Sequence, residues 1–234
     1  MRKIKKCSNT YIAVAMCMLF IELFNYDTAR YVIKPLLTVI LVLYLHSNTT
    51  SSLNKTLLTY ALAFSFIGDV LLLTPNNPNH FIFGLIAFLL AHISYIITFI
   101  TNFKTNETYL PHKQTVALIS IVVIFASLLY TFLYRYLGEM LIPVTIYMII
   151  IVTMALTAIL RSTTVGKKSF YRVLTGSFLF LISDSILAID KFAIKIPVSG
   201  FWIMLTYMSA QYLIIDGMRK YLVNNYQKNK YSAV

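Results

Sequence analysis

Apolar runs of about 20 residues, separated by short polar stretches, dominate this chain and exclude most folds. A helical run of this length crosses the hydrocarbon core of a bilayer, which is roughly 30 Å thick. We mark eight runs, at about 9–24, 30–46, 56–73, 80–100, 114–134, 140–160, 171–190 and 198–218. Only 12% of the 234 residues are charged, where a soluble chain carries roughly 25%, so a soluble enzyme is excluded. The sequence predicts an all-α, polytopic integral membrane protein with eight transmembrane helices.

The basic residues predict the orientation of these helices. If all eight runs cross, 15 of the 20 Lys and Arg residues fall on the side of both chain ends and 5 on the other side. Positive charge collects on the cytoplasmic side of a membrane. We therefore expect basic cytoplasmic tails at 1–8 and 219–234 around a transmembrane domain at 9–218, in the plasma membrane if the source is bacterial. The basic residues behind the net charge of +12 then contact lipid headgroups, and no nucleic-acid partner is expected.

Prolines and cysteines add two expectations. The six prolines fall between runs or in the first turn of a run, where a missing N–H costs little. Pro35 is assigned to such a first turn. We expect no proline inside a helix, which disfavours a transporter built from broken helices. The two cysteines, Cys7 and Cys17, form no disulfide or metal motif.

The two halves of the chain show weak sequence similarity to each other. Residues 66–72 resemble residues 181–187, each with a central aspartate, and residues 91–97 resemble residues 210–215. The third and seventh runs point the same way, so the similarity predicts a parallel four-plus-four repeat. Short matches also arise by chance in apolar sequence, and both explanations stay open.

Three charged residues lie inside the apolar runs. An ionised side chain at mid-membrane costs about 2.5–3.5 kcal/mol on insertion scales, so each of them requires an explanation. At about 1.5 Å per residue, Asp69, Asp184 and Lys34 lie about 6–7 Å outward of the midpoints of their runs. They share one depth in the outer half of the membrane. A structural ion pair between Lys34 and Asp69 would leave Asp184 without a cation, whereas a common site uses both carboxylates.

Four uncharged polar side chains lie closer to the midplane. His92, Tyr147, Tyr207 and Gln211 fall within about 5 Å of it on the same scale. Each is a candidate for a pocket below the aspartates. The commoner role of such residues is a hydrogen bond between helices, because membrane proteins use them to join helices.

Two carboxyl groups facing one dry pocket have a characteristic chemistry. Mutual repulsion keeps one of them protonated as an acid, while the other stays ionised as a base. The pair suits hydrolysis through a cation-like transition state, as in glycosidases. It suits proton-coupled transport equally well, and the residues alone do not choose between the two.

Several short segments follow one another in an order typical of a known family. They are Lys34-Pro35-Leu36, Gly68-Asp69-Val70-Leu71-Leu72, Phe88 with Ala91-His92 and Tyr95, Ser183-Asp184-Ser185, and Tyr207 with Ala210-Gln211 and Gly217. Over about residues 30–218 this ordered set resembles the YhhN-like family of membrane proteins, which includes the lysoplasmalogenases.

The resemblance implies hydrolysis of the vinyl-ether bond of a lysophospholipid, the lysoplasmalogen, to a fatty aldehyde and a glycerophospho-alcohol. It implies that Asp69 and Asp184 are essential and that no metal or organic cofactor is required. We expect one aspartate to protonate the enol ether and the other to stabilise the cation and activate water. Lys34 would hold the substrate phosphate or tune Asp69. The remaining substrate-binding residues would be His92, Tyr95, Tyr147, Tyr207 and Gln211.

The depth of the aspartates suits such a lipid. A lysolipid keeps its headgroup at the interface, with the vinyl-ether bond several ångströms deeper, so we expect access from the outer leaflet. The main alternative is a proton-coupled lipid transporter or flippase that uses the same carboxylates. A non-catalytic lysolipid-binding protein and a hydrolase of another ether or ester lipid are further alternatives.

Overall fold

The fold is described by a computed structural model for residues 2–24, 26–47, 49, 52–74, 78–101, 110–163 and 165–232. Within these ranges the chain forms eight long α-helices and no β-strand. Their bounds are α1 Arg2–Phe24, α2 Asp27–His46, α3 Leu53–Leu71, α4 Pro78–Ile100, α5 His112–Leu133, α6 Leu141–Leu160, α7 Lys167–Ala188 and α8 Ser199–Ser232. The prediction of an all-α membrane protein is confirmed, and each of the eight apolar runs lies within or largely within one helix.

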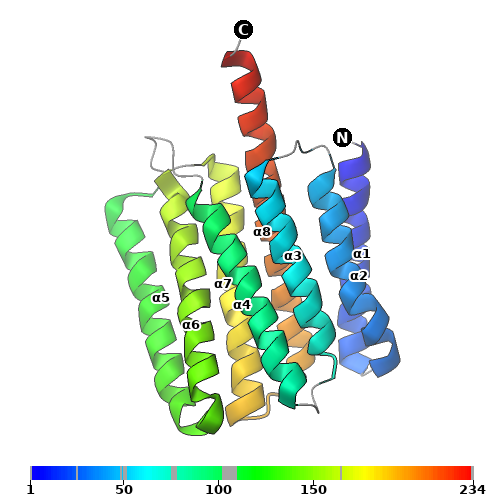
Figure 1. The fold of residues 1–234 in the computed structure, drawn as a ribbon, viewed down its shortest axis with the longest axis vertical. Coiled ribbons are helices and arrows are strands. Elements are labelled where there is room, and N and C mark those ends of the chain that lie inside the picture. Colours follow the sequence, from blue (N-terminus) through cyan, green and yellow to red (C-terminus); the bar gives the residue numbers. More distant parts are fainter. Residues whose placement is uncertain are drawn as a thin grey trace.

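The eight helices stand side by side in a single bundle (Figure 1). The two chain ends lie at the same end of it, and α8 projects beyond the other helices there. The α1–α2, α3–α4, α5–α6 and α7–α8 connections lie at the opposite end, which we call the loop end. Short 3₁₀ turns, Tyr134–Tyr136 and Gly138–Met140, and a π-helical turn, Ile189–Ala193, belong to these connections.

Six helices of the described residues are long and apolar enough to cross a membrane. They are α1, α2, α4, α5, α6 and α7. The other two, α3 and α8, carry Asp69 and Gln211, which are buried in the bundle.

The expectation that no proline lies inside a helix is wrong for Pro35. Helix α2 begins at Asp27, two turns before this residue, so Pro35 lies in its interior. The sequence reading placed the start of the helix at residue 30, because the apolar run begins there. The more polar residues 27–29 nevertheless continue the helix towards the loop end.

The closest helix pairs are α3 with α4 and α7 with α8. Glycine makes the second approach possible: a Cβ on Gly176 would lie 2.9 Å from the carbonyl oxygen of Ala210, and one on Gly217 would lie 3.0 Å from that of Ser169. Small residues at contact points are the usual means of bringing two membrane helices together, because packing replaces the hydrophobic effect as the driving force. The two pairs supply Asp69 and Asp184, the acidic residues of the two similar segments.

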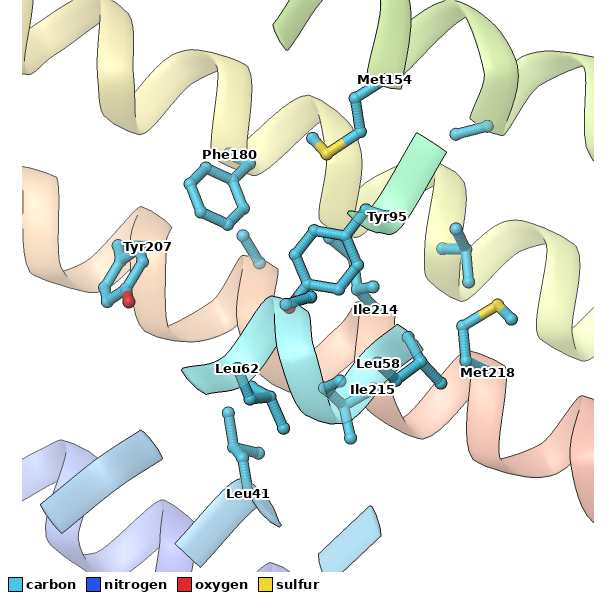
Figure 2. Packing of buried hydrophobic residues seen from close by; sticks show 14 of the residues in the cluster. Leu41, Leu58, Leu62, Tyr95, Met154, Phe180, Tyr207, Ile214, Ile215 and Met218 are labelled. Carbon is cyan, nitrogen blue, oxygen red and sulfur yellow. The ribbon is translucent and has the colours of Figure 1, made fainter. Parts of the chain in front are cut away.

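The bundle core lies where these pairs meet α2 and α6 (Figure 2). Tyr95 of α4 is fully buried there, among Leu58 of α3, Met154 of α6 and Ile214 of α8. Phe180 of α7 lies between this apolar layer and Tyr207, with which it makes an edge-on ring contact at 5.4 Å. The core therefore forms the floor beneath the polar groups that lie nearer the loop end.

Candidate active site

A pocket of about 530 Å³ opens the bundle interior near the loop end. Its wall contains residues of α1, α2, α3, α4, α6, α7 and α8 and of the α7–α8 connection. The titratable residues of this wall are Glu22, Arg30, Lys34, Asp69, Tyr147, Asp184, Asp190 and Tyr207. Most of the remaining wall is apolar, with Leu72, Leu85, Phe88, Ile203 and Met204 among its members. A pocket with many apolar residues and a few convergent polar groups is typical of a small-ligand site.

Asp69 lies on the α3 side of the pocket and is almost completely buried, with 1% of its side chain exposed. Its Oδ2 atom accepts hydrogen bonds from the Tyr207 hydroxyl at 2.8 Å and from the Thr38 hydroxyl at 3.2 Å. The ammonium of Lys34 lies 3.5 Å from Oδ1. Two helices besides α3, α2 and α8, therefore fix this carboxylate, and one of its partners is a cation.

Asp184 lies on the α7 side of the same pocket and is more accessible, with 15% of its side chain exposed. Its Oδ2 atom accepts a hydrogen bond from the Tyr147 hydroxyl of α6. The Nε2 atom of His92, on α4, lies 3.5 Å from the same oxygen and 3.4 Å from the Tyr147 hydroxyl. Among the described residues, neither lysine nor arginine forms an ion pair with Asp184.

A second layer of polar residues lies behind the pocket wall. The Tyr95 hydroxyl donates to Oε1 of Gln211 at 2.6 Å. Gln211 Nε2 then donates to the Ser65 hydroxyl at 2.9 Å and to the Tyr207 hydroxyl at 3.3 Å. This chain of hydrogen bonds ends at the tyrosine that holds Asp69.

The structure thus divides the eight residues singled out from the sequence. Lys34, Asp69, Tyr147, Asp184 and Tyr207 line the pocket. His92, Tyr95 and Gln211 do not form part of its wall, which corrects the expectation that they line it. Their side chains are at most 2% exposed, because the core packs around them, and they reach the pocket through hydrogen-bonding partners.

Several polar residues of the site were not predicted from the sequence, among them Thr38, which donates a hydrogen bond to Asp69, and the wall residues Glu22, Arg30 and Asp190. Thr38 and Arg30 lie one turn to either side of Lys34 on α2, so the i, i+4 spacing of the three was the available signal. Glu22 lies near the end of the first apolar run, where a charged residue needs no special explanation. Its carboxylate accepts a hydrogen bond from Arg30 Nη2 at 2.6 Å across the α1–α2 connection.

The donor set of the pocket resembles an acid–base site more than a metal site. In the part of the chain that the structure describes, no three His, Cys, Asp or Glu side chains converge as metal ligands would. Two carboxyl groups, each held by a tyrosine hydroxyl and facing one pocket, can donate and accept protons on opposite sides of a bound molecule.

Comparisons with known proteins identify the relatives of this chain. The sequence profile of the YhhN family matches residues 29–218. Lysoplasmalogenase TMEM86A of Bos taurus is 34% identical over 157 residues, which are 65% of this chain and 61% of the bovine protein. Lysoplasmalogenase of Mycobacterium tuberculosis is 31% identical over 160 residues, 67% of this chain and 58% of that protein. Lysoplasmalogenase TMEM86B of Homo sapiens is 31% identical over 158 residues, 68% of this chain and 61% of that protein. The chain therefore covers less than two thirds of each relative, and no solved structure matches it.

Proposed function

The chain belongs to the YhhN family, and we propose that it is a membrane-embedded hydrolase that cleaves the vinyl-ether bond of lysoplasmalogens. The observation that carries the proposal is that Asp69 and Asp184, from two different helices, line one largely apolar pocket. The names of the relatives support it, since all three are lysoplasmalogenases. A single-chain lipid also suits a pocket whose polar groups lie at one end of a membrane bundle.

We assign the acid role to Asp184 and the base role to Asp69. The Lys34 ammonium at 3.5 Å offsets part of the cost of burying an ionised Asp69, and in this role the carboxylate stabilises a cation in the pocket. Asp184 has no lysine or arginine partner among the described residues and is the more exposed carboxyl in the pocket, so we give it the role of proton donor to the substrate. Tyr147 and His92 orient its carboxyl group towards the pocket.

The reaction then balances in two stages. Asp184 protonates the β-carbon of the enol ether, which produces an oxocarbenium ion beside the Asp69 carboxylate. Water adds to this cation and gives its proton to Asp69, which leaves a hemiacetal. When the hemiacetal collapses, Asp69 returns a proton to the departing glycerol oxygen and the hemiacetal hydroxyl gives its proton to Asp184. Both aspartates regain their starting states, and the products are an aldehyde and a glycerophospho-alcohol.

The other predicted residues serve this pair. Lys34 tunes Asp69, one of the two roles expected for it, because its ammonium lies next to that carboxylate. Tyr207 and Tyr147 each donate to one aspartate. Gln211 and Tyr95 position Tyr207 from behind, and His92 does the same for Asp184.

The membrane setting completes the proposal. All eight helices cross the bilayer, with both chain ends in the cytoplasm and the loop end outside, as the 15 to 5 distribution of basic residues favours. The pocket then faces the outer leaflet of the plasma membrane in a bacterial source. The pairs α3–α4 and α7–α8 correspond as parallel repeats, each supplying one aspartate.

Hydrolysis in D₂O tests the chemistry directly. Purified protein in detergent is given lysoplasmenylcholine, and the aldehyde is reduced at once with borohydride and analysed by mass spectrometry. We expect one deuterium on the carbon next to the former carbonyl, because that carbon receives the catalytic proton. A lipid transporter releases no aldehyde in this assay. An aldehyde without deuterium at that carbon contradicts the protonation step.

A further inference from the structure

We propose that Arg30, held in place by Glu22, binds the headgroup phosphate of the lysolipid. This inference rests on the proposed function and adds a specificity-determining residue to it. Within the described pocket wall, Arg30 and Lys34 are the two cationic side chains. Both are paired with a carboxylate, but Lys34 is the more buried of the two, at 13% exposed against 30% for Arg30, so Arg30 is the more accessible cation of the wall.

The spacing of the two cations matches the substrate. Arg30 and Lys34 lie four residues apart on α2, one helical turn, so Arg30 is about 6 Å nearer the loop end. In a lysoplasmalogen, five covalent bonds separate the vinyl-ether oxygen from phosphorus, a reach of about 6 Å at roughly 1.2 Å per bond of an extended chain. A vinyl ether placed at Asp69 and Lys34 therefore brings the phosphate level with Arg30.

Glu22 gives the guanidinium a fixed position. Its carboxylate lies 2.6 Å from Arg30 Nη2 and its side chain is 5% exposed, whereas that of Arg30 is 30% exposed. The pair thus has a buried anchor and an accessible cation. A planar guanidinium is permanently charged and binds in a rigid fork, so the contact with Glu22 fixes its orientation while its positive charge still attracts a phosphate. Holding the side chain in advance reduces the entropy lost when the lipid binds.

Two other cations at the loop end contact residues of the pocket wall without lining the pocket themselves. Lys191 lies over the ring of Phe81 at 5.0 Å, and Lys195 pairs with Asp190 at 3.4 Å while 83% of its side chain is exposed. Neither Lys191 nor Lys195 belongs to the pocket wall. The phosphate subsite is therefore assigned to Arg30.

The test compares two substrates that differ only in the phosphate. Full-length protein in mixed micelles is given 1-alkenyl-glycerophosphocholine and 1-alkenyl-glycerol, and kcat/KM is measured for wild type and for Arg30→Gln. We expect the variant to lose tenfold or more in the ratio of phospho-substrate to neutral substrate, mainly through KM, because a charge-assisted hydrogen bond is lost. Arg30→Lys should recover part of this ratio. Arg135→Gln, an exposed arginine at the same end outside the pocket wall, should keep the wild-type ratio.

Each outcome decides a different point. An equal loss on both substrates means that Arg30 supports the fold alone, and an unchanged ratio means that the phosphate binds elsewhere; both overturn the inference and leave the proposed hydrolase intact. If wild type cleaves neither substrate, the proposed function fails. Binding of the non-cleavable 1-alkyl-glycerophosphocholine and 1-alkyl-glycerol measures the same discrimination without turnover. Arg30→Gln should weaken binding of 1-alkyl-glycerophosphocholine and leave binding of 1-alkyl-glycerol unchanged.

Discussion

The two sides of the pocket present the same carboxyl group in different surroundings. On the α3 side, Asp69 is 1% exposed and touches a lysine ammonium and the hydroxyls of Tyr207 and Thr38. On the α7 side, Asp184 is 15% exposed and contacts a tyrosine hydroxyl and an imidazole. The difference teaches that a matched pair of acidic residues can be given unequal tasks by their neighbours alone. Asp69 is paired with a lysine, and Asp184 pairs with neither lysine nor arginine among the described residues.

Replacing either aspartate should have the largest effect. Asp69→Asn and Asp184→Asn keep the shape of the side chain and remove its acid–base chemistry, so each should lower kcat/KM by roughly 10²–10⁴-fold. The comparison predicts different residual pH profiles. Loss of the base Asp69 should remove the fall of activity at low pH, and loss of the acid Asp184 should remove the fall at high pH.

Residual rates across the pH range in detergent check this assignment. Melting temperatures of both variants serve as the control for folding. If Asp69→Asn instead lost the fall at high pH, the two roles would have to be exchanged.

Replacing Lys34, the cation next to Asp69, should have the second-largest effect on activity. Lys34→Met leaves a buried carboxylate without its positive partner, and we expect kcat/KM to fall about 100-fold, since separating such a pair costs several kcal/mol. Lys34→Arg should retain more activity than Lys34→Met. The matched control is Lys55→Met, which removes a lysine at the opposite end of the bundle. Full activity of Lys34→Met would show that Asp69 needs no cation and would remove the contrast between the two sides.

Replacing the tyrosines that donate hydrogen bonds to the aspartates should have the next-largest effect on activity. Tyr207→Phe and Tyr147→Phe each remove one hydrogen bond to a carboxylate, and each should lower kcat about 10-fold. Tyr130→Phe is the control, because Tyr130 lies outside the pocket wall and accepts a hydrogen bond from Thr145. An effect of the same size in the control would point to a general loss of stability.

The sequence predicted the positions of groups along the helices much better than their directions around them. Hydropathy and the rise of 1.5 Å per residue are local, so the runs 80–100 and 140–160 agree closely with α4 at Pro78–Ile100 and α6 at Leu141–Leu160. They also brought Asp69, Asp184 and Lys34 to one depth, and the structure puts all three in one pocket wall.

Rotation about each helix axis depends on how neighbouring helices pack, which no single run encodes. His92 and Gln211 were therefore expected in the wall but lie behind it. For the same reason the Glu22–Arg30 contact escaped notice, since it joins two helices across a turn that the apolar pattern treats as a boundary.

The smallest effect should come from the layer behind the α3 side. Tyr95→Phe removes the hydroxyl that donates to Gln211, which in turn donates to Tyr207, so the loss reaches Asp69 only through two intermediates. We expect kcat to fall about threefold with KM unchanged, a change of less than 1 kcal/mol. A double-mutant cycle with Tyr207→Phe isolates the path. If Tyr95 acts through Tyr207, adding Tyr95→Phe to Tyr207→Phe should change kcat no further. A full threefold loss in both backgrounds would mean that Tyr95 supports the core directly, and the layered description of the Asp69 side would have to be abandoned.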